Sequence, residues 1–128
     1  MSTVRFAVSA APCRPITEVA AVIRTAKARG FAMAWVGDSQ LLQRDAYAAL
    51  TLAVASATSR RLAAALSSPL AQHPALLASA ANTIAEPAPG RMALGLGSSE
   101  SAVKPVGLRP ARAVRRTGTP PASTCGTS

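Results

Sequence analysis

The sequence has few aromatic residues, few acidic residues, two cysteines and no long apolar run. Its aromatic content is 3%, and the 49% hydrophobic content is mostly alanine, so we expect a thin core for 128 residues. No run reaches the roughly 18 apolar residues that cross a bilayer, which argues against a membrane protein. The amino-terminal stretch lacks a basic leader before a long apolar centre, so we expect no secretory signal.

The two cysteines carry no sign of a disulfide framework. Cys13 and Cys125 stand far apart, without a CxxC pair or a nearby histidine. Isolated thiols fit a reducing cytosol, so the sequence predicts a cytoplasmic protein. The close ligand spacing of a zinc site is absent, and we predict no metal site.

Positive charge is in excess, with 14 Lys+Arg against 5 Asp+Glu and a formal net charge of +9. Such an excess can indicate a nucleic-acid partner, which is one alternative function. The bases are scattered, however, except for a cluster at Arg109, Arg112, Arg115 and Arg116. No aromatic residues lie between them as stacking platforms, so we do not expect nucleic acid as the partner.

The most informative feature is a period of about 30 residues. Short β-prone segments begin at this spacing, over Val4–Val8, Met33–Val36, Leu62–Leu66 and Met92–Leu96. Segments with helical periodicity lie between them, over Thr17–Arg29, Asp45–Thr58 and Pro74–Glu86. This alternation is typical of βαβ units and predicts an α/β protein with about four parallel strands and three helices.

Local signals mark the ends of these helices. Thr17 and Asp45 are predicted N-caps, Gly30 a helix stop, and Pro74 a first-turn proline. On the first helix, Val19, Val22, Ile23 and Ala26 form the predicted buried face, and Trp35 on the second strand is predicted to lie in the core.

Two architectures fit this pattern. A closed (β/α)₈ barrel needs eight strands, whereas a doubly wound, flavodoxin-like binding module ends nearer this length. Residues 113–128 are rich in Thr, Ser, Gly and Pro, and we expect a disordered tail there after a domain over residues 1–112.

Candidate chemistry follows the strands, because parallel α/β folds place ligands at the carboxyl ends of their strands. Asp38 is predicted to point into this mouth, with helix capping as the alternative. Ser67 and Ser68 either bind a ligand or serve an x-Pro turn. The Gly97 turn lets backbone N–H groups approach an anion, but the Rossmann pattern is incomplete. His73 is interpreted as a helix-cap neighbour, with a general base as the alternative.

At these residues the sequence resembles a known family. The ordered set GFAMAWVGDS, SPLAQHP, GRMALGLGSS and VGLRPAR resembles the luciferase-like, flavin- or deazaflavin-dependent oxidoreductases. The most similar subgroup is the coenzyme F-420-dependent reductases of the methylene-tetrahydromethanopterin reductase type. The resemblance extends from residue 4 to about residue 112.

The resemblance implies a fold, a cofactor and a site. The fold is the first half of a (β/α)₈ TIM barrel, with coenzyme F-420 or FMN at the strand mouth and hydride transfer to or from a small organic substrate. A non-prolyl cis peptide is implied at Ala65-Leu66, where Ala65 replaces the usual glycine. The implied cofactor-binding residues are Asp38, Ala65, Leu66, Ser67, Gly97, Ser98 and Ser99, and no catalytic residue is assigned.

The chain leaves the family pattern after Arg112, where it continues as AVRRTGTPPASTCGTS. This change predicts a truncated or frameshifted reading frame and a fragment that is weak or inactive. The phosphate site that barrels build after strands seven and eight should then be missing. The fourth strand would expose unpaired backbone groups, which favours self-association.

Overall fold

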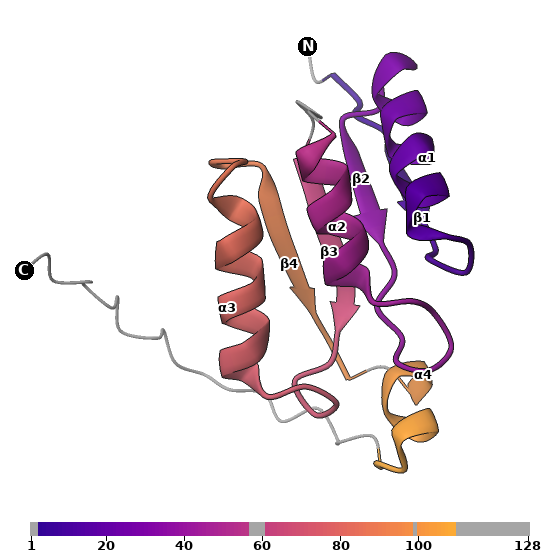
Figure 1. Ribbon diagram of the computed structural model, residues 1–128, viewed down its shortest axis with the longest axis vertical. Coiled ribbons are helices and arrows are strands. Elements are labelled where there is room, and N and C mark those ends of the chain that lie inside the picture. Colours follow the sequence, from indigo (N-terminus) through magenta and orange to yellow (C-terminus); the bar gives the residue numbers. More distant parts are fainter. Residues whose placement is uncertain (1–2, 57–60, 99, 110–128) are drawn as a thin grey trace, which may run out of the picture.

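The computed structural model describes residues 3–56, 61–98 and 100–109, and its strands and helices alternate (Figure 1). The strands are β1 (Ala7–Ala10), β2 (Met33–Val36), β3 (Arg61–Ser67) and β4 (Met92–Leu96). The helices are α1 (Ile16–Ala28), α2 (Ala46–Ala55), α3 (Pro74–Ala85), the short α4 (Glu100–Val103) and a 3₁₀ turn (Lys104–Val106). The predicted alternation is confirmed, and α4 and the 3₁₀ turn add to it. The predicted boundary at residue 112, the predicted tail and the predicted helix end at Thr58 lie outside the described residues, and α2 ends at Ala55.

The sheet is parallel, with strand order β1-β2-β3-β4. Each connection passes through one helix, and right-handed crossovers in one direction place all the helices on one face. Figure 1 shows α1, α2 and α3 side by side in front of the sheet. A flavodoxin-like sheet reverses its strand order and carries helices on both faces. The observed order is therefore that of a partial (β/α)₈ barrel.

Local signals set most element ends. Asp45 Oδ1 accepts a hydrogen bond from Ala48 N at 2.7 Å and caps α2, and Pro74 lies in the first turn of α3, as predicted. Gly30 follows α1 with φ of 84°, which confirms the helix stop. The predicted N-cap at Thr17 is wrong, because the carbonyl oxygen of Pro15 accepts from Glu18 N and the helix begins at Ile16.

The predicted first strand is placed too early. β1 starts at Ala7, which pairs with Met33, the first residue of β2. Val4 and Phe6 therefore precede the paired segment, and they are 73% and 69% exposed. This register is set by the packing of Val8 and Ala10 against the core. The β propensity of the residues before Ala7 does not set it.

The core lies between the sheet and the three helices. Its strand residues alternate along each strand, with Ala34 and Val36 on β2 and Leu62 and Ala64 on β3. Two predictions are wrong here. Val22 is exposed, and Ala20 is buried in its place on α1. Trp35 is only half-buried and lies on the opposite face of the sheet, where its ring approaches Gly95 of β4.

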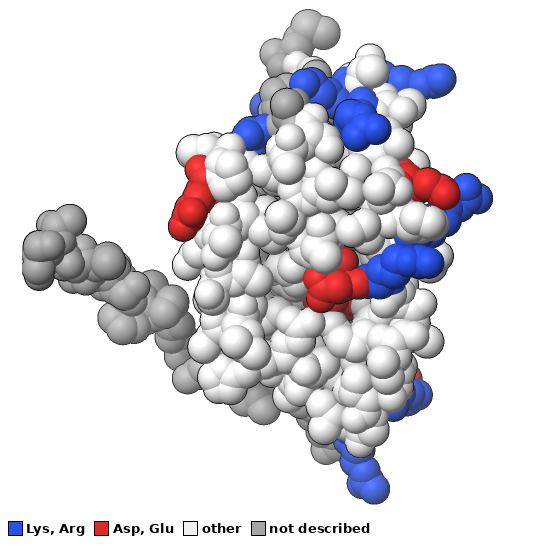
Figure 2. Space-filling view, viewed as in Figure 1, with Lys and Arg blue, Asp and Glu red and all other residues white. Residues whose placement is uncertain are grey.

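Few charged side chains lie over α2 and α3. Figure 2 shows an acidic and a basic group side by side near the lower end of α2 and otherwise little charge over these helices, with basic side chains near the amino ends of the strands and beside α1. Neither α2 nor α3 contains a charged residue. Over the described ranges, no helix has the length and apolar character needed to cross a membrane.

Candidate functional site

Two of the predicted site residues meet in a hydrogen bond at the carboxyl edge of the sheet. Ser67 Oγ, at the end of β3, donates to Asp38 Oδ2 at 2.6 Å. Asp38 follows β2, and the parallel register of β2 and β3 brings the two strand ends together. Both side chains are buried, with Asp38 4% and Ser67 0% exposed. Asp38 does not cap a helix, because the cap of α2 is Asp45.

Two further side chains complete this buried cluster. The Tyr47 hydroxyl lies 2.7 Å from Ser67 Oγ, and Gln40 Nε2 donates to Asp38 Oδ1 at 2.8 Å. The sequence analysis did not identify either residue. The signals for them were weak: Tyr47 is the only tyrosine, in the first turn after the Asp45 cap, and Gln40 stands two residues beyond Asp38.

Burial raises the pKa of Asp38 above its ordinary value. The hydrogen bond from Ser67 opposes this rise, the charge of Asp45 adds to it, and the hydrogen bond from Gln40 opposes it. Burial also raises the pKa of Tyr47 above its ordinary value of 10.0, so the hydroxyl is a hydrogen-bond donor throughout the neutral range. Asp38 is thus a carboxyl that takes up a proton more readily than an exposed one.

The end of β3 has an unusual backbone. The Ala65–Leu66 peptide bond is cis, at the position that the resemblance implies, although alanine replaces glycine there. The pairing of β3 with β4 shifts register between Ala64 and Ser67. The Leu66 side chain is 49% exposed, and a Cβ on Gly97 would lie 3.0 Å from its Cδ1. Ala65, Leu66 and Gly97 therefore form one continuous surface beside Ser67.

The other predicted positions differ in their roles. Ser68 Oγ accepts from Leu70 N at 3.3 Å, so Ser68 serves the turn, as one alternative predicted. Ser98 is exposed, and Ser99 lies outside the described residues. His73 Nδ1 accepts from Ala75 N at 3.2 Å, so His73 caps α3.

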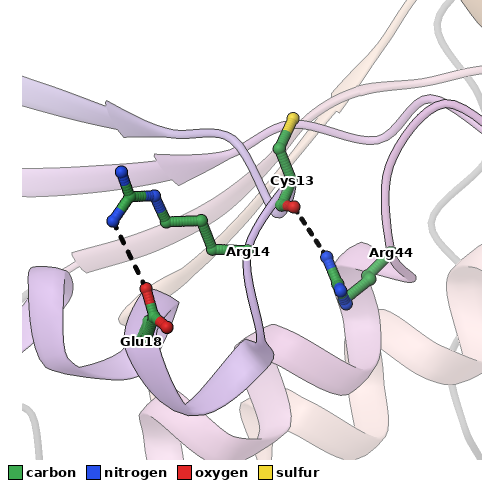
Figure 3. A network of polar contacts seen from close by, with 4 residues as sticks. All are labelled: Cys13, Arg14, Glu18 and Arg44. Atoms are coloured by element: carbon green, nitrogen blue, oxygen red, sulfur yellow. Dashed lines mark hydrogen bonds and ion pairs between the residues drawn. The ribbon is translucent and has the colours of Figure 1, made fainter.

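An arginine ties together the loops after β1 and β2. Arg44 Nη1 donates to the Cys13 carbonyl oxygen at 2.7 Å, and Arg44 N donates to Pro12 O at 3.0 Å (Figure 3). Figure 3 also shows Arg14 beside Glu18, at 3.5 Å across one turn of α1. The main-chain and side-chain bonds of Arg44 hold the Asp38 loop against its neighbour.

A hollow of about 190 Å³ lies beside Asp38, lined by Asp38, Ser39, Gln40, Leu41, Gln43, Arg44 and Asp45. The carboxamide oxygens of Gln40 and Gln43 are buried, and neither accepts a hydrogen bond from the residues that the structure describes. A larger hollow of about 620 Å³ lies near Arg5 and Arg61, at the amino ends of the strands. We assign the candidate site to the smaller hollow, because α/β barrels bind ligands at the carboxyl edge. Within the described ranges, no cluster of His, Cys, Asp and Glu could hold a metal ion.

Known proteins are similar to this chain in sequence and in fold. Residues 2–118 match the luciferase-like monooxygenase family. Over 97 residues the chain is 30% identical to a 5,10-methylenetetrahydromethanopterin reductase of Methanolobus tindarius, which covers 76% of this chain and 29% of that protein.

The solved structure of the coenzyme F-420-dependent tetrahydromethanopterin reductase of Methanopyrus kandleri is also similar. It matches with a TM-score of 0.78 and 27% identity, over 84% of this chain and 31% of that one. The chain thus spans less than a third of the length of these two reductases. Because the family match extends over nearly the whole sequence, the chain belongs to the luciferase-like monooxygenase family.

Proposed function

We propose that the carboxyl edge of this sheet is part of the cofactor site of an F-420-dependent oxidoreductase, and that the reaction is hydride transfer involving a small organic substrate. The observation that carries the proposal is the buried Ser67–Asp38 pair beside the Leu66–Gly97 surface, at the edge where barrels bind ligands. The similarity to two methanopterin reductases supports F-420, and FMN is the alternative cofactor.

The side chains present suit a flat heterocycle with polar edges. Gly95 in β4 and Gly97 just after it place no side chain next to Trp35 and Leu66, which offer apolar surface. Rotation of the Gln40 or Gln43 side chain toward the hollow would expose a buried carboxamide oxygen as an acceptor for a ring or substrate N–H group. When bound, the deazaflavin supplies the hydride chemistry, and the protein supplies binding and orientation.

We assign the residues of the site as follows. Asp38 orients a polar edge of the ligand or holds a proton near it, and Leu66 excludes water from one face. The proposed cofactor-binding residues are Asp38, Ala65, Leu66, Ser67, Gly97, Ser98 and Ser99. The hydroxyl hydrogen of Ser67 is directed to Asp38, so this side chain acts on a ligand through Asp38.

We further propose that the 128-residue polypeptide by itself binds the cofactor weakly and is weak or inactive as a catalyst. Barrels of this class build their phosphate grip after strands seven and eight. The structure describes four strands, whereas such a barrel has eight, and the chain spans 31% of the matched reductase structure. A family domain over residues 1–112 and a cytoplasmic location belong to the same proposal, and the exposed thiol of Cys13 suits a reducing compartment.

We also infer that the polypeptide associates with itself. Among the described strands, β1 pairs only with β2, and β4 pairs only with β3. Unpaired strand edges are templates for pairing with another chain, and Leu96 at the end of β4 is 56% exposed. The partners that we propose are therefore the cofactor, a small substrate and a second copy of the chain. We propose neither nucleic acid nor a membrane as a partner.

An NMR titration tests the cofactor proposal. We expect roughly millimolar F-420 to shift the backbone amides of Asp38, Leu66 and Gly97, and FMN to shift them less. A His73→Ala variant, changed at an exposed helix cap, should behave like the wild type. The site assignment is contradicted if the amides of these three residues do not move or if only those near Arg5 and Arg61 do. Tight stoichiometric binding would contradict the expected weakness.

A further inference from the structure

We propose that Tyr47 is a positioning residue for Asp38 and acts through the hydroxyl of Ser67. The inference builds on the proposed function, in which Asp38 faces the ligand. The three side chains form one hydrogen-bonded chain, with 2.7 Å between the Tyr47 and Ser67 hydroxyls and 2.6 Å from Ser67 Oγ to Asp38 Oδ2. Tyr47 has no assigned role in the sequence pattern, yet its hydroxyl is the outer end of this chain.

The direction of the chain follows from counting hydrogens. A serine hydroxyl has one hydrogen to donate, and an ionised carboxylate only accepts. Ser67 gives its hydrogen to Asp38, so Tyr47 must donate to Ser67. Gln40 donates to the other carboxylate oxygen. Both oxygens of Asp38 are then satisfied, and every donor in the cluster points toward the carboxylate.

The chain joins three elements whose positions are set independently. Tyr47 lies in the first turn of α2, which the Asp45 cap anchors, while Ser67 ends β3 and Asp38 follows β2. Tyr47 is 8% exposed and Ser67 is 0% exposed. Water therefore has little access to replace a lost hydroxyl. Removal of one side chain from the hydrogen-bonded chain should weaken the remaining hydrogen bonds.

The chain discriminates between the two protonation states of Asp38. A hydrogen bond donated to a carboxylate favours its charged form, and Ser67 donates such a bond to Asp38 Oδ2. Donation from Tyr47 to Ser67 polarises the Ser67 hydroxyl and strengthens that bond. The wild-type arrangement therefore favours the ionised carboxylate, and Tyr47→Phe should raise the pKa of Asp38.

Other charged groups near the cluster stay unchanged in that variant. The charge of Asp45 acts on Asp38, and Arg44 lines the same hollow while its guanidinium donates to the Cys13 carbonyl oxygen. On α4, Glu100 pairs with Lys104, and α4 reaches the loop after β2 through the Ser39 and Ser101 hydroxyls, 3.4 Å apart. A change in the pKa of Asp38 would thus report the loss of the phenol hydroxyl.

The test is an NMR titration of the Asp38 carboxyl carbon in the full chain without cofactor. We expect Tyr47→Phe to increase the proton affinity of Asp38 by about threefold to tenfold, and Ser67→Ala by more. The matched control is Ser56→Ala, which removes a hydroxyl at the carboxyl end of α2 that donates to Leu52 O. A Tyr47→Phe curve that overlays the Ser56→Ala curve would overturn the proposal.

A second measurement needs no substitution that risks the fold. Tyr47 is the only tyrosine, so 3-fluorotyrosine can replace it uniformly. The more acidic phenol is a better donor to Ser67 and should lower the pKa of Asp38, opposite in sign to the phenylalanine variant. An unchanged or raised pKa would count against the proposal. If this coupling holds but F-420 moves no amide at the carboxyl edge, the cofactor proposal fails and the hydrogen-bond chain stands.

Discussion

At the scale of single residues, Asp38 links folding to the candidate chemistry. Its carboxyl is 4% exposed and hydrogen-bonded to Ser67 and Gln40. Burial raises its pKa above the ordinary value of 3.8, so the folded protein binds this proton more readily than the unfolded chain does. Stability contributed by Asp38 is therefore largest at low pH and is lost as pH rises through the raised pKa.

Asp38→Asn should remove this pH dependence. The asparagine has the same shape and no charge to bury, and Gln40 can turn its unpartnered oxygen toward the new amide N–H group. We expect the variant to be more stable than the wild type at neutral pH, by about 1 kcal/mol, and the difference to shrink as pH falls toward 4. Urea unfolding at a series of pH values measures this.

The control for this experiment is Asp45→Asn. That change removes the neighbouring carboxylate but keeps an effective helix cap. Its unfolding free energy should keep the pH dependence of the wild type, displaced to slightly lower pH, because the charge of Asp45 adds to the raised pKa of Asp38. If the unfolding free energy of Asp38→Asn fell with rising pH as steeply as that of the wild type, Asp38 would not be the source of the pH dependence.

At the scale of elements, the contact between β3 and β4 depends on two glycines that are not equivalent. A Cβ on Gly95 would lie 3.1 Å from the carbonyl oxygen of Ala64, and backbone cannot move aside at low cost. A Cβ on Gly97 would meet the end of the Leu66 side chain, which is 49% exposed and has room to rotate.

These contacts predict different costs for the same substitution. Gly95→Ala should destabilise the protein by about 1–3 kcal/mol, the usual range for overpacking. Gly97→Ala should cost less than about 0.5 kcal/mol, because a side chain yields where backbone does not. Chemical denaturation of the two variants gives the comparison directly. Equal losses, or a larger loss at Gly97, would show that the β3–β4 contact is not the constraint described.

At the scale of the whole molecule, the described part is a sheet with helices on one face. Trp35 and Gly95 lie on the other face, where no described element covers the sheet. Parallel sheets are normally covered on both faces, so this face and the β4 edge should find a partner.

Sedimentation measurements test that association. We expect the average mass to rise with protein concentration, and Ala93→Lys to reduce the rise by placing a charge on β4 beside the open edge. Ala78→Lys adds the same charge on the exposed surface of α3 and should leave association unchanged. A monomer at every concentration would contradict the inference.

Much of the fold could be predicted because its signals are local. The Asp45 cap, the Gly30 stop and first-turn Pro74 depend on residues within one turn, and each was correctly identified. Predictions that depended on packing were less accurate. Thr17 is not a cap and Val22 is not buried, because contacts with other elements decide where α1 begins and which face it buries.

The sequence by itself determined the strand–helix period and placed Asp38 and Ser67 at the ends of neighbouring strands. Only the tertiary structure decided that these two side chains form a hydrogen bond and that the Tyr47 hydroxyl extends it. The tertiary structure also decided that Gln40 donates to the other carboxylate oxygen. The physical reason is separation along the chain: Tyr47 and Asp38 lie 20 and 29 residues from Ser67. No local pattern records a contact that forms only when β2, α2 and β3 pack together.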